Sequence, residues 1–204
     1  MKALITTIPF AEKDKTPLDL LEANNIEYVI NPLNKKITSD ELAEMITDFD
    51  VIIAGTEQIT AKVMDRAKNL KMISRVGIGL DSVDLLAAKA RDIKVSYTPD
   101  APAPAVAELA IGMMLTLLRF VHVSNFQMHS GEWHRFSGRR LSKVVIGIIG
   151  VGRVGKGVLR HLKGFGNPKV LINDISIKDD ITGEFNIEWV SKEDIYKQSD
   201  IISL

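Results

Sequence analysis

The stretch that decides the fold of this chain is KVVIGIIGVGRVG, residues Lys143 to Gly155. An apolar run rich in β-branched residues leads into three glycines, Gly150, Gly152 and Gly155, with the spacing G-x-G-x-x-G. This order predicts a strand, a tight turn and the start of a helix. In such a turn the first glycine bends the chain off the strand, the second leaves room for a pyrophosphate, and the third lets the helix pack closely.

A glycine triplet alone is weak evidence, because an ordinary turn between a strand and a helix also contains glycines. Here an amphipathic helical segment and a second apolar strand, Lys169 to Ile172, follow, and Asp174 stands about 20 residues after the triplet. A carboxylate at the tip of that strand binds the ribose hydroxyls of an adenosine and repels a 2′-phosphate. We therefore predict an NAD site rather than an NADP site, with Arg153 and Val154 in the helical turn that faces the pyrophosphate.

The composition indicates a globular protein that acts on small molecules. Of the 204 residues 46% are hydrophobic, which is ample for a packed core. Lys plus Arg and Asp plus Glu both number 26, so no basic field favours nucleic acid or an anionic membrane. The lack of cysteine excludes a disulfide scaffold, a thiolate metal site and a cysteine nucleophile, and we predict no metal site. The apolar run at the N-terminus is too short for a signal peptide, so a cytoplasmic protein is expected.

The first 98 residues alternate short apolar strands with amphipathic helices, which predicts a parallel sheet with helices on its faces. Ser39 and Asp81 stand where helix N-caps are expected. The predicted strands are Lys2 to Thr6, Glu27 to Ile30, Val51 to Ala54, Met72 to Arg75 and Lys94 to Tyr97. The predicted helices are Leu18 to Asn24, Asp40 to Thr47, Ala61 to Asn69 and Ser82 to Ala90.

The turn RVGIGLD, Arg75 to Asp81, lies between a predicted strand and a predicted helix. Gly77 and Gly79 flank Ile78 and permit a loop whose backbone N–H groups converge, which is one way to bind a carboxylate without a charged side chain. A flexible turn that binds nothing has the same glycine pattern. The spacing alone leaves both interpretations open.

The segment TPDAPAP, Thr98 to Pro104, contains three prolines and is interpreted as a crossover between two domains, residues 1–98 and 99–204. The helix predicted over Ala105 to Val121 is apolar on nearly all sides. We expect it to be buried between the domains or against a second subunit. Its uncharged stretch is too short to span a membrane.

The predicted order continues after Asp174 with a polar loop over Lys178 to Glu184, a short strand over Ile187 to Val190 and a helix capped by Ser191. A buried strand begins at Ile201. The second half of a Rossmann sheet needs further strands, so we expect the nucleotide-binding domain to be incomplete at its C-terminus.

Four blocks, in this order and spacing, make the chain resemble the D-isomer-specific 2-hydroxyacid dehydrogenases, and within them the phosphoglycerate dehydrogenase-like members. The resemblance runs from about Val51 to the last residue, and it implies a flavodoxin-like substrate domain followed by a Rossmann NAD-binding domain. The blocks are Arg75 to Asp84, Thr98-Pro99 with Ala105 to Ala110, Gly131 to Trp133 with Arg135, and Gly147 to Gly155 with Asp174.

The resemblance also implies an activity, which is hydride transfer between NAD and a small D-2-hydroxy acid, with 3-phosphoglycerate as one candidate. It implies that the long apolar helix helps to form a homodimer. The residues expected to bind the cofactor are Gly150, Gly152, Arg153, Val154, Gly155 and Asp174. Those expected to bind the carboxylate of the 2-hydroxy or 2-oxo acid are Val76, Gly77, Ile78 and Gly79.

The catalytic residues of the resembled family are an arginine, a glutamate and a histidine from segments after the strand that begins at Ile201. None of them can be assigned here, and the resemblance implies that they lie beyond Leu204. Two alternatives remain, an NAD-sensing interaction module like the corepressors that share this fold, and an inactive fragment. The histidines of the chain do not match the family's histidine and are expected at surfaces or interfaces: His122, His129, His134 and His161.

Overall fold

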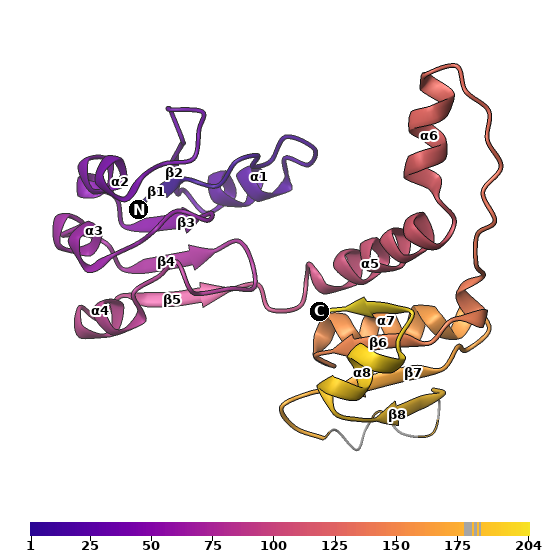
Figure 1. Ribbon diagram of the computed structural model, residues 1–204. Helices are drawn as coiled ribbons and strands as arrows, with labels where there is room; N and C mark the ends of the chain where they lie inside the picture. Colours follow the sequence, from indigo (N-terminus) through magenta and orange to yellow (C-terminus); the bar gives the residue numbers. More distant parts are fainter. Residues whose placement is uncertain (178–180, 182, 184) are drawn as a thin grey trace. The chain divides into compact units, whose positions relative to one another are not determined.

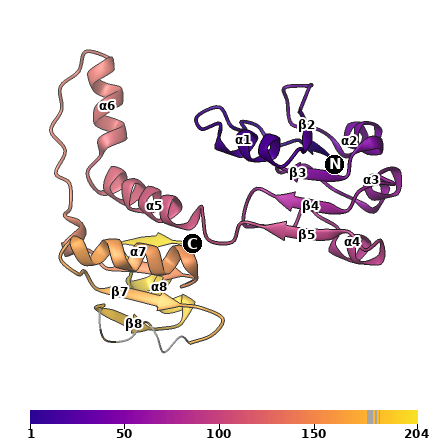
Figure 2. The ribbon, with the colours of Figure 1, turned by 180° about the vertical axis from the view of Figure 1, so that it is seen from behind.

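The computed structural model describes residues 1–177, 181, 183 and 185–204. Apart from residues 181 and 183, the polar loop predicted over Lys178 to Glu184 lies outside these described residues. The chain divides into two compact units, Met1–Ala101 and Pro102–Leu204 (Figures 1 and 2). Each unit has a parallel sheet with helices packed against it, as the alternating pattern predicts.

The first unit contains a five-stranded sheet in the order β2-β1-β3-β4-β5, and all its strand pairs are parallel. This is the strand order of flavodoxin-like folds, so the predicted fold class is confirmed for this unit. The strands are β1 (Lys2–Ile5), β2 (Glu27–Ile30), β3 (Val51–Ala54), β4 (Met72–Arg75) and β5 (Lys94–Tyr97).

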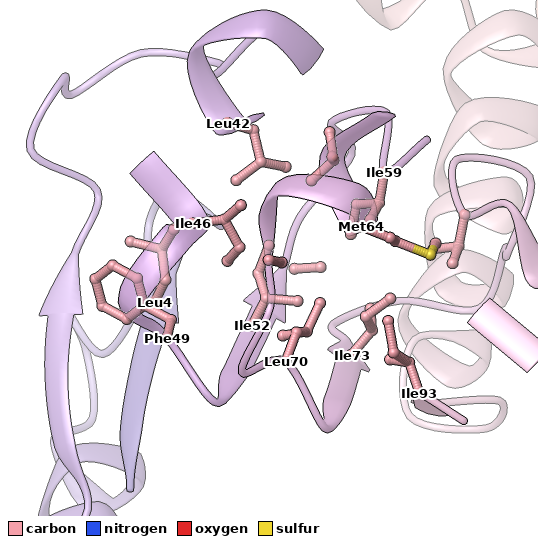
Figure 3. Close-up of a cluster of buried hydrophobic side chains, with 14 of the residues drawn as sticks. Leu4, Leu42, Ile46, Phe49, Ile52, Ile59, Met64, Leu70, Ile73 and Ile93 are labelled. Carbon is pink, nitrogen blue, oxygen red and sulfur yellow. The ribbon is translucent and has the colours of Figure 1, made fainter. Parts of the chain in front are cut away.

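Four α-helices accompany this sheet, namely α1 (Thr16–Ala23), α2 (Ser39–Met45), α3 (Ala61–Arg66) and α4 (Leu85–Ala90), with a 3-10 turn η1 (Ile46–Asp48) after α2. Helices α2, α3 and α4 lie side by side along the sheet, and α1 lies apart from them (Figures 1 and 2). Figure 3 shows the resulting core, in which Leu42 of α2 and Met64 of α3 meet Ile52 and Ile73 of the strands.

The predicted caps of two helices in this unit were wrong. Helix α2 is capped by Thr38 rather than Ser39, because the Thr38 side chain accepts from the Glu41 N–H while the Glu41 carboxylate accepts from the Thr38 N–H. Helix α4 is capped by Asp84 rather than Asp81, and its carboxylate accepts from the Ala87 N–H at 2.9 Å. The residues before Asp84 are held outside the helix by a parallel bridge between Ile59 and Val83.

The second unit contains a four-stranded parallel sheet in the order β8-β7-β6-β9, which matches the first four strands of a Rossmann sheet. Its last strand pairs with the first, with Ile201 opposite Ile146. The elements are α5 (Ala103–Leu118), α6 (Val121–His129), η2 (Leu141–Lys143), β6 (Ile146–Ile149), α7 (Arg153–Gly164), β7 (Val170–Asn173), β8 (Ile187–Trp189), α8 (Lys192–Gln198) and β9 (Ile201–Ser203).

The helix predicted over Ala105 to Val121 is α5, which ends at Leu118, and a second helix, α6, begins at Val121, because Phe120 adopts a left-handed conformation with φ of 56° between them. The Phe120 ring stacks on Phe136 at 5.2 Å between centroids. One face of α5 packs against α7 so closely that a side chain at Gly157 would place its Cβ 2.7 Å from the Cβ of Ala107. The other face is exposed, so the expected burial of α5 on several sides is not found within this unit.

Within the described part of the chain, no single helix is long and apolar enough to cross a membrane. Helices α5 and α6 together reach the required length and composition, but they are bent by 65° at the break between them.

Candidate active site

The glycine turn lies where β6 ends and α7 begins. Gly150 has φ of 97°, a value that favours glycine, and its N–H donates to the carbonyl oxygen of Asn173 at 2.8 Å. Gly152 is the N-cap residue of α7. A Cβ at Gly155 would lie 2.2 Å from the carbonyl oxygen of Gly150, so the backbone leaves no room for any side chain there. The third glycine therefore sets how closely the helix approaches the turn.

Asp174 follows β7 and reaches back to this turn. Its Oδ2 accepts a hydrogen bond from the N–H of Val151 at 2.7 Å. Val151 is fully buried, so the contact anchors the centre of the turn. The structure thus brings together the acid and the glycines, although about 20 residues separate them in the sequence.

The first turn of α7 borders open space beside these glycines. No atom would lie within 4 Å of a Cβ at Gly150 or Gly152. Arg153 is exposed, and Val154 is half-buried against the core of this unit. The positive end of the helix dipole and the amides of its first turn favour an anion at this position. The arrangement fits a dinucleotide pyrophosphate, with Asp174 near the end of the neighbouring strand.

The predicted carboxylate loop, Val76 to Gly79, follows β4 in the first unit. The N–H of Val76 donates to the carbonyl oxygen of Ala54 at 2.9 Å, and the N–H of Gly77 donates to the Thr98 hydroxyl at 2.8 Å. Within the described residues, the amides of Ile78 and Gly79 make no hydrogen bond. Of the four residues in the loop, these two have the amides available to a carboxylate.

Arg75 lies against the same loop. A Cβ at Gly77 would lie 2.6 Å from Arg75 Nη1, and Gly77 has φ of 149°. A residue with a side chain would therefore collide with the Arg75 guanidinium at this position. Nη1 donates to the carbonyl oxygen of Val76. Nε is buried and has no hydrogen-bond partner in the described part of the chain.

A cavity of about 190 Å³ lies at the carboxyl ends of β1, β3 and β4. Thr6, Glu57, Arg75 and Val76 contribute to its lining. Sequence reasoning missed Thr6 and Glu57. The available signal was their position, since both follow buried parallel strands, whose carboxyl ends meet at one edge of the sheet.

All four histidines belong to the second unit. His122, His129 and His134 are exposed, and His161 is half-buried in the last turn of α7. The ring of His134 contacts Phe136 edge-on at 4.7 Å between centroids. Among the described residues no group of three or more histidine, aspartate and glutamate side chains has the arrangement of a metal site.

Comparison with known proteins gives one family. The family profile described as D-isomer specific 2-hydroxyacid dehydrogenase, catalytic domain, matches residues 5–202. The hydroxypyruvate reductase of Thermotoga maritima is 34% identical over 196 residues, which are 95% of this chain and 61% of that protein. The D-3-phosphoglycerate dehydrogenase of Methanocaldococcus jannaschii is 35% identical over 173 residues, 82% of this chain and 33% of that protein.

Among solved structures, the NAD-dependent formate dehydrogenase from Staphylococcus aureus in complex with NAD superimposes with a TM-score of 0.79 at 28% identity. The match covers 100% of this chain and 65% of that one. The chain therefore spans between a third and two thirds of the length of these three proteins.

Proposed function

The chain belongs to the family of D-isomer specific 2-hydroxyacid dehydrogenases, and on that basis we propose that it forms part of an NAD-dependent oxidoreductase. The reaction is hydride transfer between NAD and C2 of a small D-2-hydroxy acid. The observation that carries this proposal is the hydrogen bond from the Val151 N–H to Asp174, because it joins the glycine turn to the acid that selects the cofactor.

The residues of the second unit fit an NAD molecule. The open space beside Gly150 and Gly152 accommodates the pyrophosphate, and the amides of Val154 and Gly155 face it from the start of α7. Asp174 is placed to accept hydrogen bonds from the adenosine ribose. When bound, the nicotinamide supplies the hydride acceptor or donor, and the protein's task is to orient it.

The first unit supplies the proposed substrate carboxylate site. The unpaired amides of Ile78 and Gly79 donate to the carboxylate, which fixes C2 of the acid without a charged side chain. Proton transfer at the C2 oxygen needs a positioned acid/base group. We assign this role to the histidine, with its glutamate and arginine partners, that the family places beyond residue 204.

Replacing Asp174 tests the cofactor assignment. In the protein expressed from its full reading frame, Asp174→Ala is expected to weaken NAD binding about 10- to 100-fold, because lost charged hydrogen bonds cost ~1.5 to 3 kcal/mol. Asp174→Asn retains an acceptor for the Val151 N–H and should lose less. Calorimetric titration with NAD measures both. Unchanged affinity in Asp174→Ala would remove this residue from the site.

We further propose that the protein is a homodimer that pairs through α5. Leu109, Met113 and Leu117 follow one another at four-residue intervals on the exposed face of this helix, and Leu109 is 63% exposed. Apolar stripes of this kind are rarely left in water, and a second copy offers the same stripe in return.

A charge within this stripe is expected to break the dimer. Met113→Glu or Leu117→Glu should shift the protein toward monomers, because a dimer would have to bury an unpaired carboxylate. Glu108→Gln, at another exposed position of the same helix, is the control and should leave the mass unchanged. Light scattering at micromolar concentration reads the mass, and a monomeric wild-type protein would contradict the proposal.

A further inference from the structure

The cavity at the carboxyl edge of the first sheet has a buried carboxyl group in its wall. Glu57 follows β3 and is only 3% exposed, yet it lines the cavity. Charged side chains are almost never buried to this extent unless they are paired. No ion pair to Glu57 is found within the described residues. Its partners must therefore be neutral donors or a ligand.

One oxygen of Glu57 is held by the protein. Oε1 accepts hydrogen bonds from the Gly55 N–H at 3.0 Å and from the hydroxyl of Thr6, which is itself buried. A Cβ at Gly55 would lie 2.9 Å from Oε2 and 3.0 Å from the Cα of Thr7, so glycine makes room for this carboxyl group. In the described part of the chain Oε2 accepts no hydrogen bond. A carboxylate oxygen that lies at a cavity without a donor from the protein can accept a hydrogen bond from a ligand.

Arg75 also contributes to the lining of this cavity, but its Nε is buried and is not open to the cavity. Lys35 also lines the cavity, but it is exposed and its Nζ lies 2.6 Å from a Glu41 carboxylate oxygen. The backbone of Lys35 is held in place by Asn31, whose Nδ2 donates to the Lys35 carbonyl at 2.8 Å. The cavity therefore has a fixed acceptor, the Glu57 carboxyl group, and the side chains of Arg75 and Lys35 in its lining.

The cavity adjoins the proposed carboxylate loop. Val76 lines the cavity and is also the first residue of the loop whose Ile78 and Gly79 amides are available. An acid whose carboxylate binds these amides therefore lies beside the cavity that Glu57 lines. At roughly 30 Å³ per water molecule, a cavity of about 190 Å³ holds a group of a few heavy atoms.

We propose that Glu57 selects 2-hydroxy acids that carry a hydroxyl group on the carbon after C2, in preference to a methyl or a phosphate group. This inference rests on the proposed function. A hydroxyl donates to Glu57 Oε2, which has no donor within the described residues. A methyl group supplies no donor to this oxygen, and a phosphate dianion presents only acceptors to a carboxylate. Sites built around a substrate hydroxyl reject the analogue that lacks it by up to about 10⁴-fold.

Steady-state kinetics on the protein from its full reading frame test the selection. With NADH, the wild type is expected to reduce hydroxypyruvate with a kcat/KM at least ~10-fold above those for pyruvate and 3-phosphohydroxypyruvate. Glu57→Gln keeps the shape of the side chain and should lower kcat/KM for hydroxypyruvate about 10- to 100-fold, with less than ~3-fold change for pyruvate. The control Glu44→Gln, at an exposed glutamate of α2, should behave as wild type.

An equilibrium titration separates this inference from the proposed function, because it needs no turnover. D-glycerate and D-lactate differ only in the C3 hydroxyl, and calorimetry on the NADH-saturated protein should show tighter binding of glycerate that Glu57→Gln abolishes. If the protein binds in this way but reduces no 2-oxo acid, the proposed reaction is wrong and the role of Glu57 stands. The role of Glu57 would be overturned by equal affinities for the two acids, by no binding of either acid, or by tighter binding of D-3-phosphoglycerate. It would also be overturned if Glu57→Gln lowered the affinity for all acids equally.

Discussion

Residues 1–204 expressed alone are expected to show no measurable dehydrogenase turnover, whereas the protein from the full reading frame is expected to convert D-2-hydroxy acids. A positioned general acid/base contributes roughly 10² to 10⁴-fold, and one donor to the developing charge on oxygen contributes roughly 10² to 10³-fold. Both are assigned to the part of the protein beyond Leu204. Their combined loss lowers the rate by at least ~10⁴-fold even where NAD still binds.

The assay measures NADH formation from D-3-phosphoglycerate and a panel of other D-2-hydroxy acids, with both proteins side by side. Calorimetric titration with NAD shows whether the short protein has a folded nucleotide-binding unit. Robust turnover by residues 1–204 would mean that the proton-transfer residues lie within this chain. If neither protein turned over any of these acids while NAD binding stayed intact, an NAD-sensing module would be favoured over an enzyme.

The second large effect is expected from a single methyl group in the glycine turn. Gly155→Ala would place a Cβ 2.2 Å from the Gly150 carbonyl oxygen, so the helix and the turn must move apart. Forced repacking of this kind costs ~1 to 3 kcal/mol or more. Because the displaced elements are those that hold the pyrophosphate, NAD affinity should fall by at least ~100-fold.

Two other glycines make matched controls. Gly152→Ala meets no atom within 4 Å, so it should fold with normal stability but occupy the space assigned to the pyrophosphate and weaken NAD binding. Gly164→Ala, in the last turn of the same helix, also meets nothing and should change neither property. Urea unfolding measures stability and calorimetry measures affinity. Normal stability and affinity in Gly155→Ala would show that the turn is looser than the structure indicates.

The strands were the most predictable part of the fold, because burial on both faces leaves a clear pattern in the sequence. A parallel strand covered on both faces reads as an apolar run rich in β-branched residues, as in Ile146–Ile149 and Val51–Ala54. The turn after Ile149 was predictable because Gly150 has a positive φ and the backbone leaves no room for a side chain at Gly155. The contact of Asp174 with the turn followed from strand pairing, since the tips of adjacent parallel strands lie together.

Features that depend on distant partners were not predictable. The end of α5 was predicted to within three residues, but the left-handed conformation of Phe120 was not, because a phenylalanine rarely adopts φ of 56°. The burial of Glu57 was not predicted. Its burial depends on Thr6, which stands 51 positions earlier and reaches it only once β1 and β3 have paired. The cap at Thr38 was missed by one residue, which is within the usual uncertainty of helix ends.

The close approach of α5 and α7 at Gly157 has a mechanical consequence. With the Ala107 Cβ beside the Gly157 backbone, no flexible side chain lies between the two helices there to absorb a displacement. Close-packed interiors are nearly incompressible, so the two helices are expected to move as one stiff body. A displacement of α5 is therefore expected to move α7 and, with it, the glycine turn at the start of that helix.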